Sequence, residues 1–151
     1  MNNISTDIPT AINETIMDYA PGSKERSSLK SKLSEMESKL YEIPIIIGGK
    51  EIYTGNLRKC IKPHDHRYIL AEYHQAGIDE VKQAITNGIE SWHSWSETPL
   101  QERTAIFRRA AQLLAGPWRD IVNAATMLNQ SKNVYQAEID SACELIDFFN
   151  F

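Results

Sequence analysis

Hydrophobic residues recur at helical spacing soon after the start of the chain. Ser23 is placed to cap a helix that runs to about residue 40, because its hydroxyl can accept a first-turn N–H. This helix would carry an apolar seam in which spacings of four and three alternate: Leu29, Leu33, Met36 and Leu40. So short a seam does not hold a coiled coil alone. We therefore expect the helix to pack against the rest of the fold, with a partner helix as the alternative. Residues 1–22, which are polar and end in turn residues, predict an extended arm.

Apolar residues in the next part of the chain predict β-structure. Residues 43–47 and 50–53 flank Gly48 and Gly49, and two glycines suit a tight hairpin turn because both can adopt positive φ. Residues 68–74 can present alternate side chains to opposite faces, which predicts a further strand. We expect that strand to join the hairpin in a small sheet.

Beyond residue 77 the apolar spacing returns to that of a helix. The apolar residues lie three and four apart on a stripe that leads to Trp92 and Trp95: Ile78, Val81, Ile85 and Ile89. We expect these tryptophans and Trp118 to be core and helix anchors, since an acidic chain is unsuited to a platform that stacks bases.

Thr98, Pro99 and Gln101 predict the start of the next helix, as the N-cap, first and third positions of a capping box. This helix would end at Gly116 and bury one face: Ile106, Ala110, Leu113 and Leu114. A further helix is expected from residue 118 to 128, and a last one after the polar break at residues 129–133.

These elements define an α+β chain, mostly helical with a β-hairpin and one further strand. The predicted parts are the arm at residues 1–22, a helix with a small antiparallel sheet at 23–76, and a helical region at 77–151. The sequence stops in mid-helix on large apolar residues, Phe148, Phe149 and Phe151, so we expect the chain to be truncated.

Composition narrows the class of protein. The 151 residues, 42% hydrophobic and 24% charged, are typical of one globular domain or a large part of one. Sixteen basic against twenty acidic residues give a net charge of −4, which disfavours nucleic acid and anionic membranes as partners. No apolar run approaches the roughly 20 residues that span a bilayer. Two cysteines are too few for a disulfide framework, and the first twenty residues lack the basic start of a secretory signal. We expect a cytoplasmic protein, or one already processed.

Few side chains suggest chemistry by themselves. Four are of metal-ligand type, Cys60, His64, His66 and His74, but their spacing matches no closed zinc pattern, so we expect no metal and keep a metal-binding module as an alternative. Cys143 has no neighbouring cation in sequence, which favours a buried structural cysteine over a nucleophile. Glu144, Asp147 and Asp140 share a helix face, which is more typical of a solvated surface than of a site. No glycine-rich phosphate-binding motif appears.

One long stretch carries a resemblance to a known family. Residues 123–151, which contain the run Glu144-Leu-Ile-Asp-Phe148, are similar to the corresponding stretch of the delta-1-pyrroline-5-carboxylate dehydrogenases, the glutamate-semialdehyde branch of the aldehyde dehydrogenase superfamily. Four shorter stretches support it: residues 18–26, 43–51, 63–66 and 103–116. The resemblance runs from about Asn13 to the end and implies the N-terminal part of the α/β aldehyde dehydrogenase fold.

The resemblance implies NAD-dependent oxidation of L-glutamate gamma-semialdehyde to L-glutamate in proline catabolism, by a cysteine nucleophile with NAD as hydride acceptor. In the family the nucleophile, the general base and the NAD-binding strands lie beyond the position of Phe151. We therefore expect no catalytic residue, no catalytic domain and no bound NAD in this chain alone. In the family the glutamate of the Glu144-Leu-Ile-Asp-Phe148 motif borders the aldehyde site, so Glu144 is the expected substrate-binding residue, whose carboxylate would attract the substrate ammonium.

The resemblance also sets the expected partners. We expect residues 77–151 to frame the cofactor-binding domain of the remainder of the dehydrogenase chain, in a homo-oligomer, and the present chain to be inactive alone. The mitochondrial matrix is the alternative location for a processed eukaryotic protein. The alternative function is a non-catalytic protein that associates through uncovered helical faces.

Overall fold

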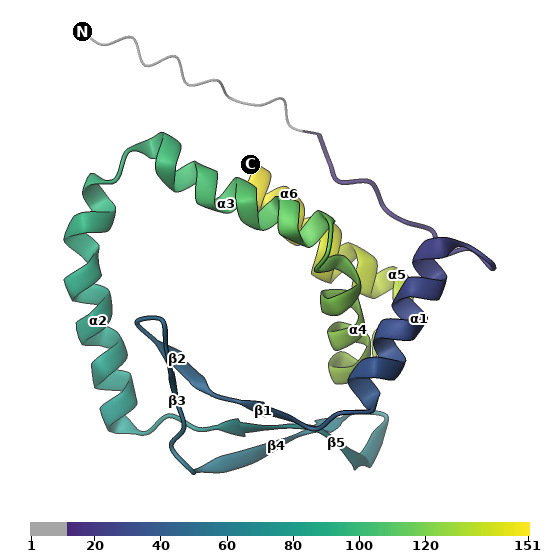
Figure 1. The fold of residues 1–151 in the computed structure, drawn as a ribbon, viewed down its shortest axis with the longest axis horizontal. Coiled ribbons are helices and arrows are strands. Elements are labelled where there is room, and N and C mark those ends of the chain that lie inside the picture. Colours follow the sequence, from purple (N-terminus) through teal and green to yellow (C-terminus); the bar gives the residue numbers. More distant parts are fainter. Residues whose placement is uncertain (1–11) are drawn as a thin grey trace, which may run out of the picture.

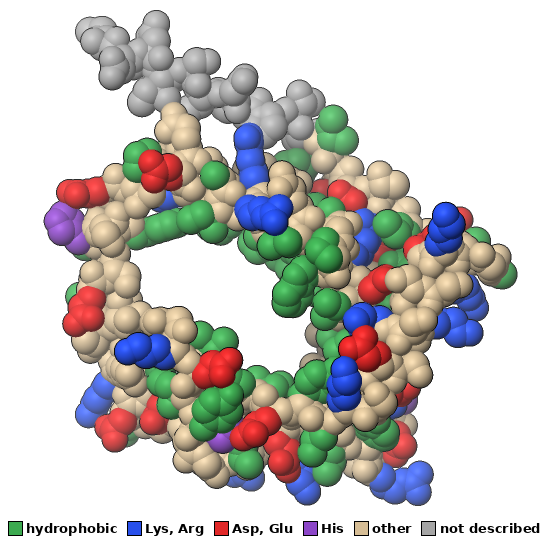
Figure 2. Space-filling view, in the orientation of Figure 1, with side chains coloured by type: hydrophobic (Ala, Val, Ile, Leu, Met, Phe, Trp, Pro, Cys, Tyr) green, Lys and Arg blue, Asp and Glu red, His purple; other side chains and the backbone are tan. Residues whose placement is uncertain are grey.

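A computed structural model describes residues 12–151. The helices and two small sheets are arranged around a central opening, with the sheets on one side of it (Figure 1). Hydrophobic side chains gather along much of the rim of the central opening (Figure 2). The predicted arm falls partly outside the described residues, and residues 12–20 form neither helix nor strand. Among residues 12–151 there is no helix both long and apolar enough to cross a bilayer.

The first helix, α1 (Lys24–Glu37), confirms the predicted start. The Ser23 hydroxyl accepts a hydrogen bond from the Arg26 N–H, as an N-cap does. Leu29 is buried with Tyr19 and Ala124, and the helix packs against α4 (Arg119–Gln130). The expectation that this seam packs within the fold is therefore confirmed, although the helix ends before Leu40, which is exposed.

The predicted hairpin is present as β2 (Ile45–Ile47) and β3 (Lys50–Ile52), which pair antiparallel. Both turn glycines have positive φ. A Cβ at Gly48 would also lie 2.7 Å from the Asn87 amide nitrogen on the neighbouring helix, so a larger residue there would displace the Asn87 side chain. This turn thus seats the hairpin against α2 (Ile78–Glu97).

The expected pairing of the further strand was wrong. That strand, β5 (Asp65–His74), joins a separate three-stranded sheet in which β1 (Tyr41–Ile43) pairs with it in parallel and β4 (Leu57–Lys62) antiparallel. Pro44 lies between β1 and β2 and has no N–H to donate, so the apolar run expected to be one strand is divided between two sheets. The chain therefore has three strands besides the hairpin within the described residues, rather than one.

The predicted capping box at Thr98 does not form. Thr98 instead closes α2, since its N–H donates to the Trp95 carbonyl and its hydroxyl to the Ser94 carbonyl. Pro99, with φ −54° and ψ 143°, is the residue that precedes α3 (Leu100–Ala115). The hydroxyl of Thr98 is thus used by the helix behind it rather than the one ahead.

The apolar stripe of α2 has the predicted spacing but no cover within the described residues. Ile85 is 58% exposed, and the tryptophans Trp92, Trp95 and Trp118 are 68%, 42% and 50% exposed. The prediction that these three are core residues was therefore wrong for the described chain. The helix is shaped to bury one face, yet none of its residues is buried in the described chain.

The C-terminal helices build the larger core. Ala111 and Leu114 of α3 pack on Ala142 and Ile146, where the chain runs through α5 (Val134–Ala137), a π-helix η1 (Glu138–Cys143) and α6 (Glu144–Asn150). The rings of Phe107 and Phe149 lie 5.8 Å apart, and Ile106 is 56% exposed, against the expectation that it is buried. The last helix is therefore not the single α-helix that was predicted, because a π-turn interrupts it.

Candidate functional site

A buried carboxylate lies at the junction of the last helices. Glu138, the first residue of η1, is 0% exposed and forms an ion pair with Arg119 of α4, which is 4% exposed. Its other oxygen accepts hydrogen bonds from the Tyr19 hydroxyl at 2.8 Å and from the Asn123 amide at 2.7 Å. Every hydrogen-bonding direction of this carboxylate is thus occupied by the protein, as a buried charge requires.

The electrostatics of this cluster follow from its burial and its partners. Burial alone would raise the pKa of Glu138, but the hydrogen bonds from Arg119, the Met17 N–H, Tyr19 and Asn123 outweigh it and hold the pKa below the ordinary value. Burial and the neighbouring Glu138 raise the pKa of the Tyr19 hydroxyl. Glu138 is therefore ionised and Tyr19 is neutral at neutral pH.

The arm of residues 13–19 crosses this junction and is tied to it by polar contacts. The Glu14 carboxylate lies 2.6 Å from Arg119, and the Thr15 carbonyl accepts a further Arg119 N–H at 2.6 Å. Asp147 of α6 accepts hydrogen bonds from the Asn13 amide and the Glu14 N–H. The arm is therefore tied to α4 through Arg119 and to α6 through Asp147.

Glu144, the expected substrate-binding residue, lies in sequence between Glu138 and Asp147, which both contact the arm. It is exposed, and it is the first residue of α6, directly after the π-helix. The three carboxylates expected on one face do not cluster, because Asp140 pairs with Lys132 at 2.5 Å while Asp147 holds the arm. Glu144 alone of the three is left to meet a ligand from outside.

Cys143 is buried, as predicted, at 5% exposure. Its sulfur accepts a hydrogen bond from Arg119 at 3.3 Å, while burial and the charge of Glu138 raise the pKa of its thiol to about 11. Because the thiol is protonated and enclosed at neutral pH, iodoacetamide should modify Cys60 in the folded chain and both cysteines after unfolding. Intact-mass spectrometry checks this, and Cys143 labelling as fast as Cys60 in the folded chain would contradict it.

The candidate metal ligands are not brought together. His64 Nδ1 lies 2.7 Å from the Ser131 hydroxyl, and the Cys60 thiol donates to the Asn129 side-chain oxygen. His74 is buried between the Gly55 N–H and the Glu42 carboxylate. Among the residues that the structure describes, no group of three or more such side chains is placed to hold a metal ion.

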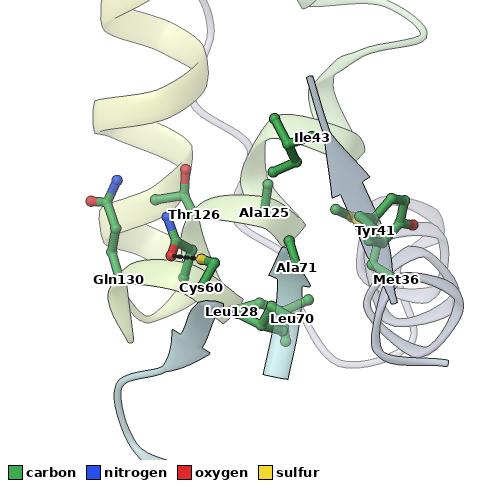
Figure 3. A pocket seen from close by; sticks show the side chains of 11 residues that line it. Met36, Tyr41, Ile43, Cys60, Leu70, Ala71, Ala125, Thr126, Leu128 and Gln130 are labelled. Carbon is green, nitrogen blue, oxygen red and sulfur yellow. Dashed lines mark hydrogen bonds between the residues drawn. The ribbon is translucent and has the colours of Figure 1, made fainter. Parts of the chain in front are cut away.

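An apolar groove of about 340 Å³ opens between the three-stranded sheet and the end of α4 (Figure 3). Leu70 and Ala71 of β5 face Leu128 and Ala125 of α4 across it, with Cys60 at one side. Its lining is mainly apolar, so it suits an apolar surface rather than a charged ligand.

Sequence reasoning missed the Glu138 cluster, although one signal was present. Glu138 lies four residues before Ala142 and eight before Ile146, so it occupies the buried face of the last helix. A carboxylate at such a position is rarely buried unless it is paired. The missing information was the partner, because Arg119 and Tyr19 lie on other elements.

Comparison with known proteins now gives the class. The aldehyde dehydrogenase family matches residues 53–151, more than half of the chain. The chain belongs to the aldehyde dehydrogenase family, and its fold is that of the N-terminal part of such an enzyme.

The more specific similarity is to one branch of that family. The chain is 45% identical to delta-1-pyrroline-5-carboxylate dehydrogenase of Agaricus bisporus over 145 residues, covering 95% of this chain and 27% of that protein. It is 42% identical to the mitochondrial enzyme of that name from Dictyostelium discoideum, covering 96% and 26%. The solved delta-pyrroline-5-carboxylate dehydrogenase of Mycobacterium tuberculosis, bound with NAD and cobalamin, matches with a TM-score of 0.94 at 42% identity, covering 100% and 28%. The chain thus spans about a quarter of the length of these relatives.

Proposed function

We propose that this chain is the N-terminal segment of an NAD-dependent dehydrogenase that oxidises L-glutamate gamma-semialdehyde to L-glutamate. The observation that carries the proposal is the match to the Mycobacterium tuberculosis enzyme along the whole chain, at 42% identity and a TM-score of 0.94. At such identity over a whole segment, the site residues of that segment are a reasonable basis for proposing a shared substrate. The oxidation would serve proline breakdown.

The part of the reaction that these residues perform is substrate binding. Glutamate semialdehyde carries an ammonium group that a simple aliphatic aldehyde lacks. Glu144 is exposed and its two carboxylate neighbours on the helix are engaged, so its charge is available to that ammonium. Glu144 is therefore proposed to select the substrate, not to transform it.

NAD binding is assigned to the remainder of the dehydrogenase chain. In the whole enzyme, bound NAD would supply the hydride acceptor for the oxidation. Residues 12–151 include no glycine-rich turn from a strand into a helix of the kind that holds a pyrophosphate, so no NAD contact is assigned to them. Their proposed role toward the cofactor domain is to frame it, with the remainder of the dehydrogenase chain as partner and a homo-oligomer as the assembly.

The exposed apolar surfaces support that framing role. The stripe of α2 and the groove beside α4 are exposed apolar surfaces of the kind that a further domain covers. The same surfaces also favour the second candidate function, a non-catalytic protein that associates through them. For location we propose the cytoplasm, with the mitochondrial matrix as the alternative, which the name of the Dictyostelium relative favours.

The deciding experiment is an assay of NADH production from glutamate semialdehyde, with the 151-residue chain beside the longest reading frame of its gene. Activity in the longer form alone supports the proposal. Activity in neither form, together with self-association of the chain, supports the interaction protein.

Glu144→Gln in the active form tests the substrate contact. A hydrogen bond to a charged group contributes about 1.5–3 kcal/mol, so kcat/KM for the semialdehyde should fall by roughly ten- to a hundredfold. Propanal, which lacks an ammonium, should be oxidised as before. Asp140→Asn is the matched control, since Asp140 is an exposed carboxylate on the preceding turn whose charge already pairs with Lys132. Equal losses for both aldehydes in Glu144→Gln would defeat the assignment.

A further inference from the structure

The backbone position of Glu144 is set by the π-helix that precedes it. The Glu144 N–H donates to the carbonyl of Ile139, five residues earlier, so the last π-type bond of η1 closes on Glu144 itself. An α-helix turns by about 100° per residue, and a π-turn holds one residue more than an α-turn. If η1 returned to the α register, Glu144 would rotate by about this angle around the helix axis.

Side chains of α4 hold η1 in this register. Arg119 and Asn123 lie four residues apart on one face of α4. Between them they bond to three of the six residues of η1: Glu138, Ser141 and Cys143. The hydroxyl of Ser141 donates to the Asn123 side-chain oxygen at 2.9 Å. The π-turn is therefore fixed by contacts across the helix pair, not by its own sequence alone.

Glu138 is the central member of this arrangement. It begins η1, it is fully buried, and it bonds to both α4 side chains and to Tyr19 of the arm. All of these contacts are buried, whereas Glu144 is exposed. Glu138 can therefore act on Glu144 only through the backbone that joins the two residues.

We propose that Glu138 is a positioning residue that, through the π-turn, aims Glu144 at the substrate ammonium. This inference rests on the proposed function, because it assigns Glu138 a role at the same substrate site. It makes selectivity for the charged aldehyde depend on a buried residue that touches no substrate. Its partners Arg119 and Asn123 help to hold the π-turn in the same way.

Glu138→Gln, in the longest active form of the protein, is the test. The amide keeps the size of the side chain but removes the charge that draws Arg119 and Asn123 together. We expect kcat/KM for glutamate semialdehyde to fall about tenfold or more, mainly through a higher KM, while propanal oxidation changes less than about twofold. Hydrogen exchange of the peptide that contains the Glu144 amide should become faster, since the side-chain contacts that hold its bond to Ile139 in place are weakened.

Glu14→Gln is the matched control. This substitution removes the other carboxylate that pairs with Arg119, and Glu14 itself makes no bond to η1. The kcat/KM for both aldehydes and the exchange rate of the Glu144 amide should therefore be unchanged. If Glu138→Gln fails to fold, Ser141→Ala removes a milder contact to Asn123 and should give a smaller loss with the same selectivity.

The outcomes separate this inference from the function on which it rests. Suppose that Glu144→Gln lowers kcat/KM for the semialdehyde alone. If Glu138→Gln, or Ser141→Ala in its place, then lowers kcat/KM for both aldehydes alike or leaves amide exchange unchanged, the positioning role is overturned and the function stands. If Glu14→Gln reproduces the selective loss, the role belongs to the arm rather than to Glu138, and the proposal is overturned. If the active form does not use the semialdehyde, both proposals fail together.

Discussion

Arg119→Met should lower the free energy of unfolding of the chain by about 3–5 kcal/mol, because it leaves a buried carboxylate without its cation. Glu138 is 0% exposed and cannot turn to water, and Glu14 and the Thr15 carbonyl would lose their partner in the same step. Urea unfolding followed by circular dichroism measures the change.

Lys132→Met is the control for that result. The Lys132–Asp140 pair also joins a residue of η1 to a cation, but its side chains are 30% and 43% exposed. An exposed pair contributes at most about 1 kcal/mol, so this substitution should change stability little. Equal effects of the two substitutions would mean that the buried cluster does not stabilise the junction.

Lowering the pH should reduce the difference in free energy of unfolding between the Arg119→Met variant and the unmodified chain. The pKa of Glu138 is held below its ordinary value in the folded state, so its contribution is present above the ordinary carboxyl range and is lost as the pH falls through the lowered pKa. In the variant the carboxyl no longer has Arg119 to keep it ionised, and protonation relieves the unpaired charge. The two unfolding curves should therefore approach each other on acidification.

The parts of the fold that sequence reasoning predicted correctly are those with local causes. Ser23 caps α1 through a bond to a residue three positions later, and the paired glycines turn the hairpin by their own backbone freedom. The starts and periods of the long helices follow from apolar spacing in the same way. Each of these signals lies within a few residues of the element it specifies.

The errors have non-local causes. Strand β1 is only three residues long and exists because it pairs with β5 about thirty positions later, which no local pattern reports. Strand β4 was missed because it is rich in lysine, and one of these, Lys62, is 7% exposed and forms an ion pair with Glu37 of α1. The burial of a charged residue depends on a partner that its own segment does not contain.

The candidate site shows the same division. Glu144 was found only through resemblance to a family, since an exposed glutamate on a helix has no distinguishing local feature. Glu138 has the local signal of a charge on an apolar face, but its partner Tyr19 lies 119 residues away. A π-turn between the two depends on such contacts, so its position was not accessible from periodicity.

Ile85→Asp should have opposite consequences in the two forms of the protein. In the 151-residue chain Ile85 is 58% exposed, so a carboxylate there stays in water and should change stability by about 0.5 kcal/mol or less. If the remainder of a dehydrogenase chain covers the α2 stripe, the same carboxylate is buried without a partner, and the longer form should lose several kcal/mol, enough to unfold it. Thermal unfolding of both forms measures the contrast.

Gln83→Asp is the control, since Gln83 lies on the opposite face of α2. This substitution carries the same cost in helix propensity and should be tolerated in both forms. Equal tolerance of Ile85→Asp in both forms would mean that no domain covers this face. Dissociation of a self-associated short chain by Ile85→Asp would instead favour the interaction protein, because the stripe would then be a contact between copies.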